Sequence, residues 1–250
     1  MFTTVAFSES IDPAGAFAKI AGVPDQHVKV SGDQITIPQF NRLLGAAAFP
    51  GTTGVEARLV SPSLRRLNPY YIYPITKALL PSGEHKDVVT PSQSYLLDTD
   101  EGLEAEIKSD PAAAEQESIV VWLADSEITP VKGSIVTVNF SFTMALVAGA
   151  WAFSEIDFVD ELPVGNYSIV GMAVNVLTGV CGRIVPVGGN HRPGVLCSPG
   201  ADFGSRLHMR YGEMGVFSTF NTQQPPGIEV LGSEAAASTT YEGYFDLIRQ

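Results

Sequence analysis

The chain has 250 residues, of which 45% are hydrophobic and only 17% are charged, and its formal net charge is −12. This length is sufficient for one large β domain or for two smaller lobes with buried cores. Proteins that bind nucleic acid directly usually present a basic face to the phosphates, so the acidic balance argues against direct contact with a genome.

Turn-forming residues are frequent, with 24 Gly and 17 Pro. Many turns and few charges favour a many-stranded sandwich over a helical bundle. The low charge also suits a surface that neighbouring molecules partly cover. Cys181 and Cys197 are too few for a disulfide framework. Two buried thiols are the expectation, and a bridge between them is left open. The residues after Met1 do not form a secretory signal.

The N-terminal region, residues 1–110, is predicted to be mixed and mostly β, and the sequence leaves open whether it forms a second barrel. Turn residues between two short apolar stretches favour a hairpin. Pro38 is a suitable first residue for a helix that ends before Pro50. Prolines on both sides of the aromatic segment argue against a central strand there. The predicted elements are a hairpin at 28–37, a helix at 38–48, a strand at 55–60 and the aromatic segment at 70–73.

An acidic stretch, Asp98 to Glu117, separates this region from the next, with Lys108 as its single cation. Such a composition is typical of a solvated connector or of a short helix start.

The C-terminal region, residues 118–250, is predicted to be a jelly-roll β-sandwich. Apolar and polar residues alternate strictly between Ile135 and Thr143, which indicates a strand with one buried face. The uncharged stretch from Gly133 to Ser154 has the length of a membrane helix, but this period of two argues against one. About eight strands at sandwich spacing are expected, at 119–123, 135–143, 151–158, 167–176, 183–187, 215–220, 228–231 and 241–248.

Catalytic signatures are missing from the sequence, which has no nucleotide-binding glycine loop, no zinc-protease motif and no nucleophile elbow. A Ser-His-Asp triad assembled from distant segments is left open. The acidic residues at 98–101 partly match a calcium loop, but Ser109 stands where the closing Glu is needed, so a solvated loop is favoured. The acidic residues at 157–161 could serve glycoside hydrolysis, although decoration of a strand end is the preferred interpretation. We therefore expect neither an enzyme, nor a metal, nor a cofactor.

The loop from Gly188 to Arg210 holds the densest positive charge of the chain, with Arg192, Arg206, Arg210 and His208. It could bind a ligand or contact a second subunit. If it pairs with acidic stretches of a neighbour, reversing the charges of Arg206 and Arg210 should weaken assembly without unfolding the monomer.

A series of short motifs in residues 122–248 resembles, in its order, the jelly-roll major capsid proteins of tailless icosahedral bacteriophages, as seen in environmental phage-like genomes. The motifs are Trp122-Leu123-Ala124-Asp125, Ala148-Gly149-Ala150-Trp151, Leu162-Pro163-Val164-Gly165-Asn166-Tyr167, Arg192-Pro193-Gly194-Val195, Arg210-Tyr211-Gly212, Gln224-Pro225-Pro226 and Tyr244-Phe245-Asp246-Leu247-Ile248.

The resemblance implies a coat subunit of a virion that is assembled in the host cytoplasm. Its partners would be copies of itself, as trimers or higher assemblies, and other virion proteins, with no direct nucleic acid; an inner membrane is left open. Closed symmetric contacts would bury apolar patches and pair loops. Residues that could make these contacts, or could instead pack on their own core, are Tyr70, Tyr71, Tyr73, Leu79 and Leu80, together with Arg192, Arg206 and Arg210.

Two other classes of function are kept beside the coat subunit. The first is a non-catalytic carbohydrate-binding or receptor-binding sandwich, which exposed aromatic residues on one sheet face would favour. The second is a hydrolase on a sandwich scaffold, which paired carboxylates in a cleft would favour.

Overall fold

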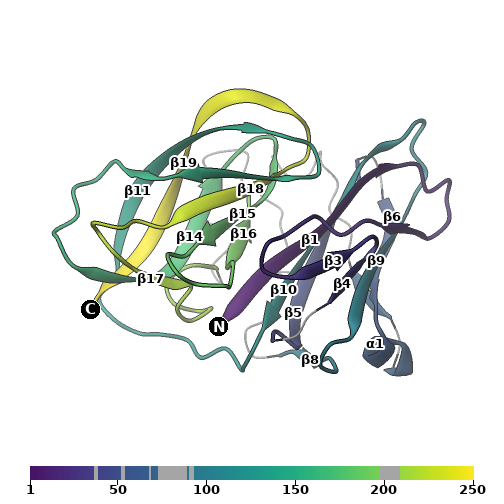
Figure 1. The fold of residues 1–250 in the computed structure, drawn as a ribbon, viewed down its shortest axis with the longest axis horizontal. Coiled ribbons are helices and arrows are strands. Elements are labelled where there is room, and N and C mark those ends of the chain that lie inside the picture. The colour runs from purple at the N-terminus through teal and green to yellow at the C-terminus, as the bar shows by residue number, and fades with distance from the viewer. Residues whose placement is uncertain (37–38, 52–53, 68, 73–88, 90–92, 198–208) are drawn as a thin grey trace.

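The computed structural model is almost entirely β, as predicted, and describes residues 1–36, 39–51, 54–67, 69–72, 89, 93–197 and 209–250. Its strands form four antiparallel sheets stacked as four layers, which we name C, D, A and B in spatial order (Figure 1). Within the described part, no helix has both the length and the apolar character needed to cross a membrane.

The N-terminal half forms the first jelly roll, which consists of sheets A and B. Sheet A has the order β1-β10-β5-β8, and in sheet B the order β2-β9-β6-β7 is extended by the hairpin β3-β4. Without the hairpin β3-β4, the first jelly roll has eight strands, which we number one to eight in chain order. Sheet A then has the strand order first, eighth, third, sixth, and sheet B has the order second, seventh, fourth, fifth. This is the strand order of a jelly roll. The bounds are β1 (Phe2–Ile11), β2 (Ala18–Ile20), β3 (Lys29–Ser31), β4 (Gln34–Thr36), β5 (Arg42–Phe49), β6 (Gly54–Val60), α1 (Pro62–Leu67), β7 (Tyr70–Ile72), β8 (Tyr95–Leu96), β9 (Gly102–Ser109) and β10 (Glu115–Ala124).

The C-terminal half repeats this topology as the second jelly roll. Sheet C has the order β11-β19-β14-β17, with β13 added at its edge, and sheet D has the order β12-β18-β15-β16. These orders again follow the first-eighth-third-sixth and second-seventh-fourth-fifth pattern. The bounds are β11 (Val136–Leu146), β12 (Trp151–Glu155), β13 (Asp157–Phe158), β14 (Asn166–Asn175), β15 (Gly179–Val185), β16 (Gly194–Leu196), β17 (Ser218–Asn221), β18 (Gly227–Gly232) and β19 (Ala236–Arg249).

Two hydrophobic cores hold the layers together. One lies between sheets A and B and includes Phe7 and Leu43. The other lies between sheets C and D and continues across sheet D onto sheet A, where it includes Trp122 and Phe2. Sheet A is therefore buried on both faces, which makes the two jelly rolls one packed unit.

The helix predicted at 38–48 is wrong, because Arg42–Phe49 is strand β5 in the middle of sheet A. All but the first residue of β5 are buried. A strand that is buried on both faces loses the alternation that marks a strand, so its apolar run could not be told from a helix by pattern.

The connector predicted at 98–117 is also wrong in its centre, because Gly102–Ser109 is strand β9 in the interior of sheet B. Leu103, Ala105 and Ile107 point into the core, and the charged residues between them point outward. The residues 110–113 do form a turn between β9 and β10.

Other predicted elements are confirmed. The hairpin predicted at 28–37 forms as β3-β4 over residues 29–36, with Gly32 at a φ of 62° in its turn, and Ile37 lies outside the described residues. The aromatic segment forms β7 at the edge of sheet B and not a central strand. The strand predicted at 119–123 forms as β10, but it pairs with β1 and β5 in the first jelly roll. The division at 110–118 stays a prediction, and this pairing favours a boundary near Ala124.

Candidate assembly surfaces and the joint between the jelly rolls

Sheet D packs on sheet A through a buried ionic cluster, which we call the joint cluster: Asp25, His27, Arg183, Arg192 and Glu229. At its centre, Arg183 on β15 is 2% exposed. Its Nη1 donates to Asp25 Oδ2 at 2.5 Å and to the Thr4 carbonyl at 3.0 Å, both in the first jelly roll. Its Nε and Nη2 both lie 2.7 Å from Glu229 Oε2 on β18. One side chain of the second jelly roll is therefore bonded to two segments of the first.

Arg192 and His27 form the outer part of the joint cluster. Arg192 donates to the carbonyls of Gly189 and His191, each at 3.0 Å, and Arg192 Nη2 contacts His27 Nε2. Burial and the nearby Arg192 lower the pKa of His27, and burial lowers the pKa of Arg192. The backbone N–H of Arg192 also donates to Thr3 Oγ1 at 2.9 Å, so this loop is fixed to β1.

Both tryptophans of the chain lie at the joint. Trp151 on β12 lies under the Arg183 guanidinium, 3.8 Å from the ring centroid to the guanidinium carbon, an arrangement that stabilises a buried cation. Trp122 on β10 is fully buried and donates its ring N–H to the Gly194 carbonyl at 2.9 Å. Apolar packing and hydrogen bonds therefore act together to fix the angle between the jelly rolls.

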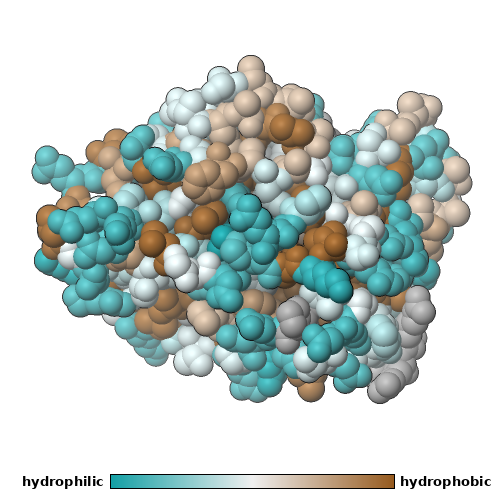
Figure 2. Space-filling view, viewed as in Figure 1, coloured by the Kyte–Doolittle hydropathy of each residue, from teal (hydrophilic) through white to brown (hydrophobic). Residues whose placement is uncertain are grey.

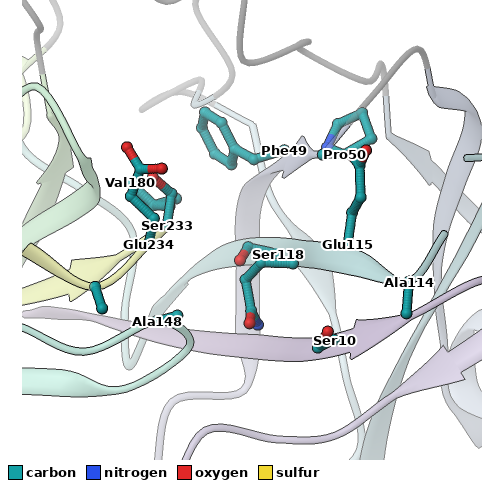
Figure 3. Close-up of a pocket in the computed structure, with 13 residues that line it drawn as sticks. Ser10, Phe49, Pro50, Ala114, Glu115, Ser118, Ala148, Val180, Ser233 and Glu234 are labelled. Carbon is teal, nitrogen blue, oxygen red and sulfur yellow. The ribbon is translucent and has the colours of Figure 1, made fainter.

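A cleft of about 470 Å³ opens between the jelly rolls (Figure 3). Glu115 and Ala114 from β10 and the preceding turn lie on one side, and Ser233 and Glu234 from the β18–β19 turn lie on the other. Phe49 contributes apolar surface between them. No basic side chain is among the described residues that line the cleft.

A second buried ion pair supports the outer side of sheet C. Asp246 on β19 is 0% exposed and accepts hydrogen bonds from Arg210 Nε and Nη2, with Nη2 at 2.8 Å. Thr137 Oγ1 donates to the same carboxylate at 2.7 Å. Burial alone would raise the pKa of Asp246, but the hydrogen bonds from Arg210 and Thr137 outweigh it and lower that pKa. This pair fixes the segment around Arg210 and Tyr211 over Gly171.

Two of the acidic residues considered for catalysis or metal binding have structural roles. Glu101 accepts a hydrogen bond from the Ser63 N–H at the start of α1. Asp160 accepts one from the Asn139 N–H at 2.6 Å. Across the described residues, no three His, Cys, Asp or Glu side chains are grouped to hold a metal ion. Cys181 and Cys197 are buried and are not joined by a disulfide.

The outer face of sheet B is one of two sheet faces that no other layer of the stack covers, and it is charged. Arg58 on β6 bonds Glu106 on β9 at 2.6 Å and stacks on Phe17 at 3.8 Å from the ring centroid. Lys19 on β2 bridges Asp33 at 3.1 Å and Glu104 at 2.9 Å. Tyr71 on β7 pairs with Arg58 in register and is 59% exposed.

The outer face of sheet C is the other sheet face that no layer of the stack covers. The segment around Arg210 lies over Gly171 on part of this face, and the exposed part is polar with little charge. Thr143 on β11 and Thr240 on β19 are paired in register and their hydroxyls lie 2.9 Å apart. Glu242 follows on the same face of β19. Figure 2 shows polar and apolar residues interspersed over one side of the molecule, without a single continuous apolar face.

The predicted interface residues do not form one group. Tyr71 is exposed on the outer face of sheet B, and Tyr70 is half-buried with its ring packed against Tyr95 at 5.2 Å. Arg192 and Arg210 are buried and bonded within the chain. That these two arginines contact another copy stays a prediction. The expectation that the monomer stays folded when the charge of Arg210 is reversed conflicts with the buried pair that Arg210 forms with Asp246. Tyr73, Leu79, Leu80 and Arg206 lie outside the described residues.

Sequence reasoning missed Arg183 and Glu229, which belong to the joint cluster, and Asp246, which forms the buried pair with Arg210. Each is a lone charged residue inside an otherwise apolar strand segment, in GVCGRIV, GIEVLG and YFDLI. Such an isolated charge is the signal that could have found them, because buried charges occur almost only as pairs.

No protein-family model and no curated protein matches the sequence. Among solved structures, the chain is similar to the major capsid protein P2 from bacteriophage PM2, with 12% sequence identity and a TM-score of 0.23, over 100% of this chain and 99% of that one. At that TM-score the likeness supports no conclusion, so the fold assignment stands on the strand order described above.

Proposed function

We propose that the protein is a viral structural protein, a coat subunit that self-assembles into an icosahedral shell. The observation that carries this proposal is the tandem arrangement of two jelly rolls in the layer order C, D, A, B. In the stack, each jelly roll places its sheet of strand order first-eighth-third-sixth before its sheet of order second-seventh-fourth-fifth. Sheets C and B, at the two ends of the stack, therefore differ in strand order. Viral capsids are a common setting of the jelly roll, although a fold alone does not establish function.

The joint within the chain suggests how copies would meet. Sheet D, with strand order second-seventh-fourth-fifth, packs on sheet A, with strand order first-eighth-third-sixth. Sheet B has the order of sheet D, and sheet C has the order of sheet A. The outer face of sheet B in one copy could therefore pack on the outer face of sheet C in the next. Such a head-to-tail contact builds a closed ring when its rotation closes.

The chemistry of the two faces fits contact between subunits that first fold separately. Arg58, Glu106 and Lys19 on sheet B are charged, and Thr143 and Thr240 on sheet C are hydroxylic. The joint inside the chain instead buries Trp122 and Phe2. Interfaces between separately folded partners are typically about as polar as the remaining surface. Three copies in a ring would place six jelly rolls around one axis, in accord with the trimers that the sequence resemblance implies.

A mixing experiment tests the head-to-tail contact. Tyr71→Arg adds bulk and charge to the outer face of sheet B, and Thr143→Arg does the same on sheet C. Each variant alone should be monomeric in size-exclusion chromatography with light scattering, where the parent protein forms trimers or larger species. An equimolar mixture should give a dimer, because each variant keeps the face that the other lacks. Leu177→Arg, at an exposed position in the β14–β15 turn, is the control and should assemble normally.

Two results would contradict the proposal. A parent protein that stays monomeric at all salt and protein concentrations excludes self-assembly, and binding to glycan arrays would then support the carbohydrate-binding alternative. Assembly that survives in both arginine variants excludes these two faces as the contact. Negative-stain microscopy of the largest species distinguishes a shell from a simple oligomer.

A further inference from the structure

The joint cluster contains a histidine in contact with an arginine. His27 follows β2 in the first jelly roll, and its Nε2 faces Nη2 of Arg192, which precedes β16 in the second jelly roll. A guanidinium only donates hydrogen bonds and stays protonated at any physiological pH. The contact therefore requires His27 Nε2 to be the unprotonated acceptor, with the imidazole neutral.

The charges that face His27 are balanced only while the imidazole is neutral. The negative groups are Asp25, two residues before His27, and Glu229 on β18; the positive groups are Arg183 on β15 and Arg192. The side chains of Asp25 and Arg183 are 3% and 2% exposed. A proton on His27 adds a third positive charge to this set, beside the Arg192 guanidinium, whose side chain is 7% exposed.

We propose that the joint between the two jelly rolls is acid-sensitive, and that protonation of His27 at Nε2 breaks its contact with Arg192 and weakens the packing of sheet D on sheet A. We expect each jelly roll to stay folded, because the strand pairing within each sheet and the core between sheets A and B do not include this contact. The proposal concerns the joint alone and does not depend on a role in a coat.

The pH range follows from the direction of the shift. Burial, with a further contribution from Arg192, lowers the pKa of His27 below 6.5 in the closed joint. The open joint therefore binds the proton more readily than the closed joint. The joint has its full strength above about pH 6.5 and weakens as the pH falls below it. A single proton changes the equilibrium by at most about tenfold per pH unit.

His191 provides a matched control in the neighbouring loop. Its pKa is also lowered by burial, but its Nε2 lies 2.9 Å from the Phe217 carbonyl, which belongs to the same jelly roll. Protonation of His191 therefore breaks no hydrogen bond between its ring and the first jelly roll, while Arg192 and the N-terminus are among the charges near it. A transition that depends on His191 and not on His27 would contradict the proposal.

The two tryptophans make the joint directly observable. Trp122 and Trp151 both lie in it, so tryptophan emission is a local readout, while far-UV circular dichroism follows the sheets of both jelly rolls. Between pH 8 and 5, the emission of the parent protein should shift to longer wavelength with a midpoint below pH 6.5, without loss of the far-UV signal. His27→Gln, whose amide oxygen can accept from Arg192 and does not titrate, should lose this shift. His191→Gln should keep it.

The opposite results overturn the proposal: no shift in the parent protein, the same shift in His27→Gln, or a simultaneous loss of far-UV signal. If His27→Gln does not fold, NMR titration of the histidine side chains in the parent protein decides the matter. A pKa of His27 at or above 6.5 then refutes the acid-sensitive joint, and a value below it, together with the emission shift, supports it.

Discussion

Replacing Asp246 by Asn should destabilise the second jelly roll strongly, because it leaves the Arg210 charge without its counterion. Asp246 is 0% exposed and Arg210 is 8% exposed, and the carboxylate accepts from the guanidinium, Thr137 and the Tyr211 N–H. Breaking a buried pair by removing one partner costs about 3–5 kcal/mol. Asn keeps the shape and one acceptor, so we expect about 3 kcal/mol, the lower end of that range.

Urea denaturation followed by circular dichroism measures this loss. At a slope of about 3 kcal/mol per molar urea, the midpoint should fall by about 1 M. Asp157→Asn, at an exposed position of β13 in the same sheet, should change the stability by less than about 0.5 kcal/mol. If Asp246→Asn is as stable as this control, the pair does not stabilise the fold and the reasoning is refuted.

The pH dependence gives an independent check on the same pair. The pKa of Asp246 is lowered below 3.8 in the folded state, so its stabilising contribution is complete above that value and is lost as the pH falls through the folded-state pKa. The stability difference between the parent protein and Asp246→Asn should therefore shrink in acid. Arg210→Met combined with Asp246→Leu should recover part of the loss, because an apolar pair removes both buried charges.

Two further substitutions test other parts of the fold in the same denaturation assay. Gly171→Ala should lower the stability by more than about 2 kcal/mol or prevent folding, because the added Cβ would lie 2.8 Å from Arg210 Cα and the backbone there cannot move without a large cost. A neutral effect would show that the segment around Arg210 does not cover sheet C. Glu117→Gln should stabilise the protein by about 1 kcal/mol at pH 7. Burial raises the pKa of Glu117, which means that the folded state favours the protonated carboxyl. The parent protein loses this contribution to stability as the pH rises through the folded-state pKa, whereas Gln stays neutral. The Ser109 hydroxyl can pair with either side chain; equal stability at pH 7, or a gain that persists at pH 4, would contradict this account.

The strands of the second jelly roll could largely be predicted from the sequence. From Thr137 to Thr143, buried residues alternate with more exposed ones, and this period of two is a local property that can be seen in the sequence alone. Gly149 lies between β11 and β12 at a φ of 67°, a conformation that glycine adopts most readily. The all-β class follows from such signals together with the many turn residues.

Strand β5 and strand β9 were missed for opposite reasons. In β5, Leu43 to Phe49 face two cores, so the apolar run carries no period. In β9, Glu104, Glu106 and Lys108 lie on the outer side of sheet B and give the segment the charged composition of a linker, although they alternate with the buried Leu103, Ala105 and Ile107.

The candidate sites depended on tertiary structure more than the elements did. Arg183 meets Asp25 across 158 residues of chain, and Arg192 meets His27 across 165. Nothing in the residues beside Arg192 or Arg210 distinguishes a cation that is exposed to a partner from one that is paired internally. The sequence alone determined the β character and the turns. Pairing between distant strands decided that the chain holds two jelly rolls in one stack, because hydrogen bonds and ion pairs form between groups that are close in space, wherever they lie along the chain.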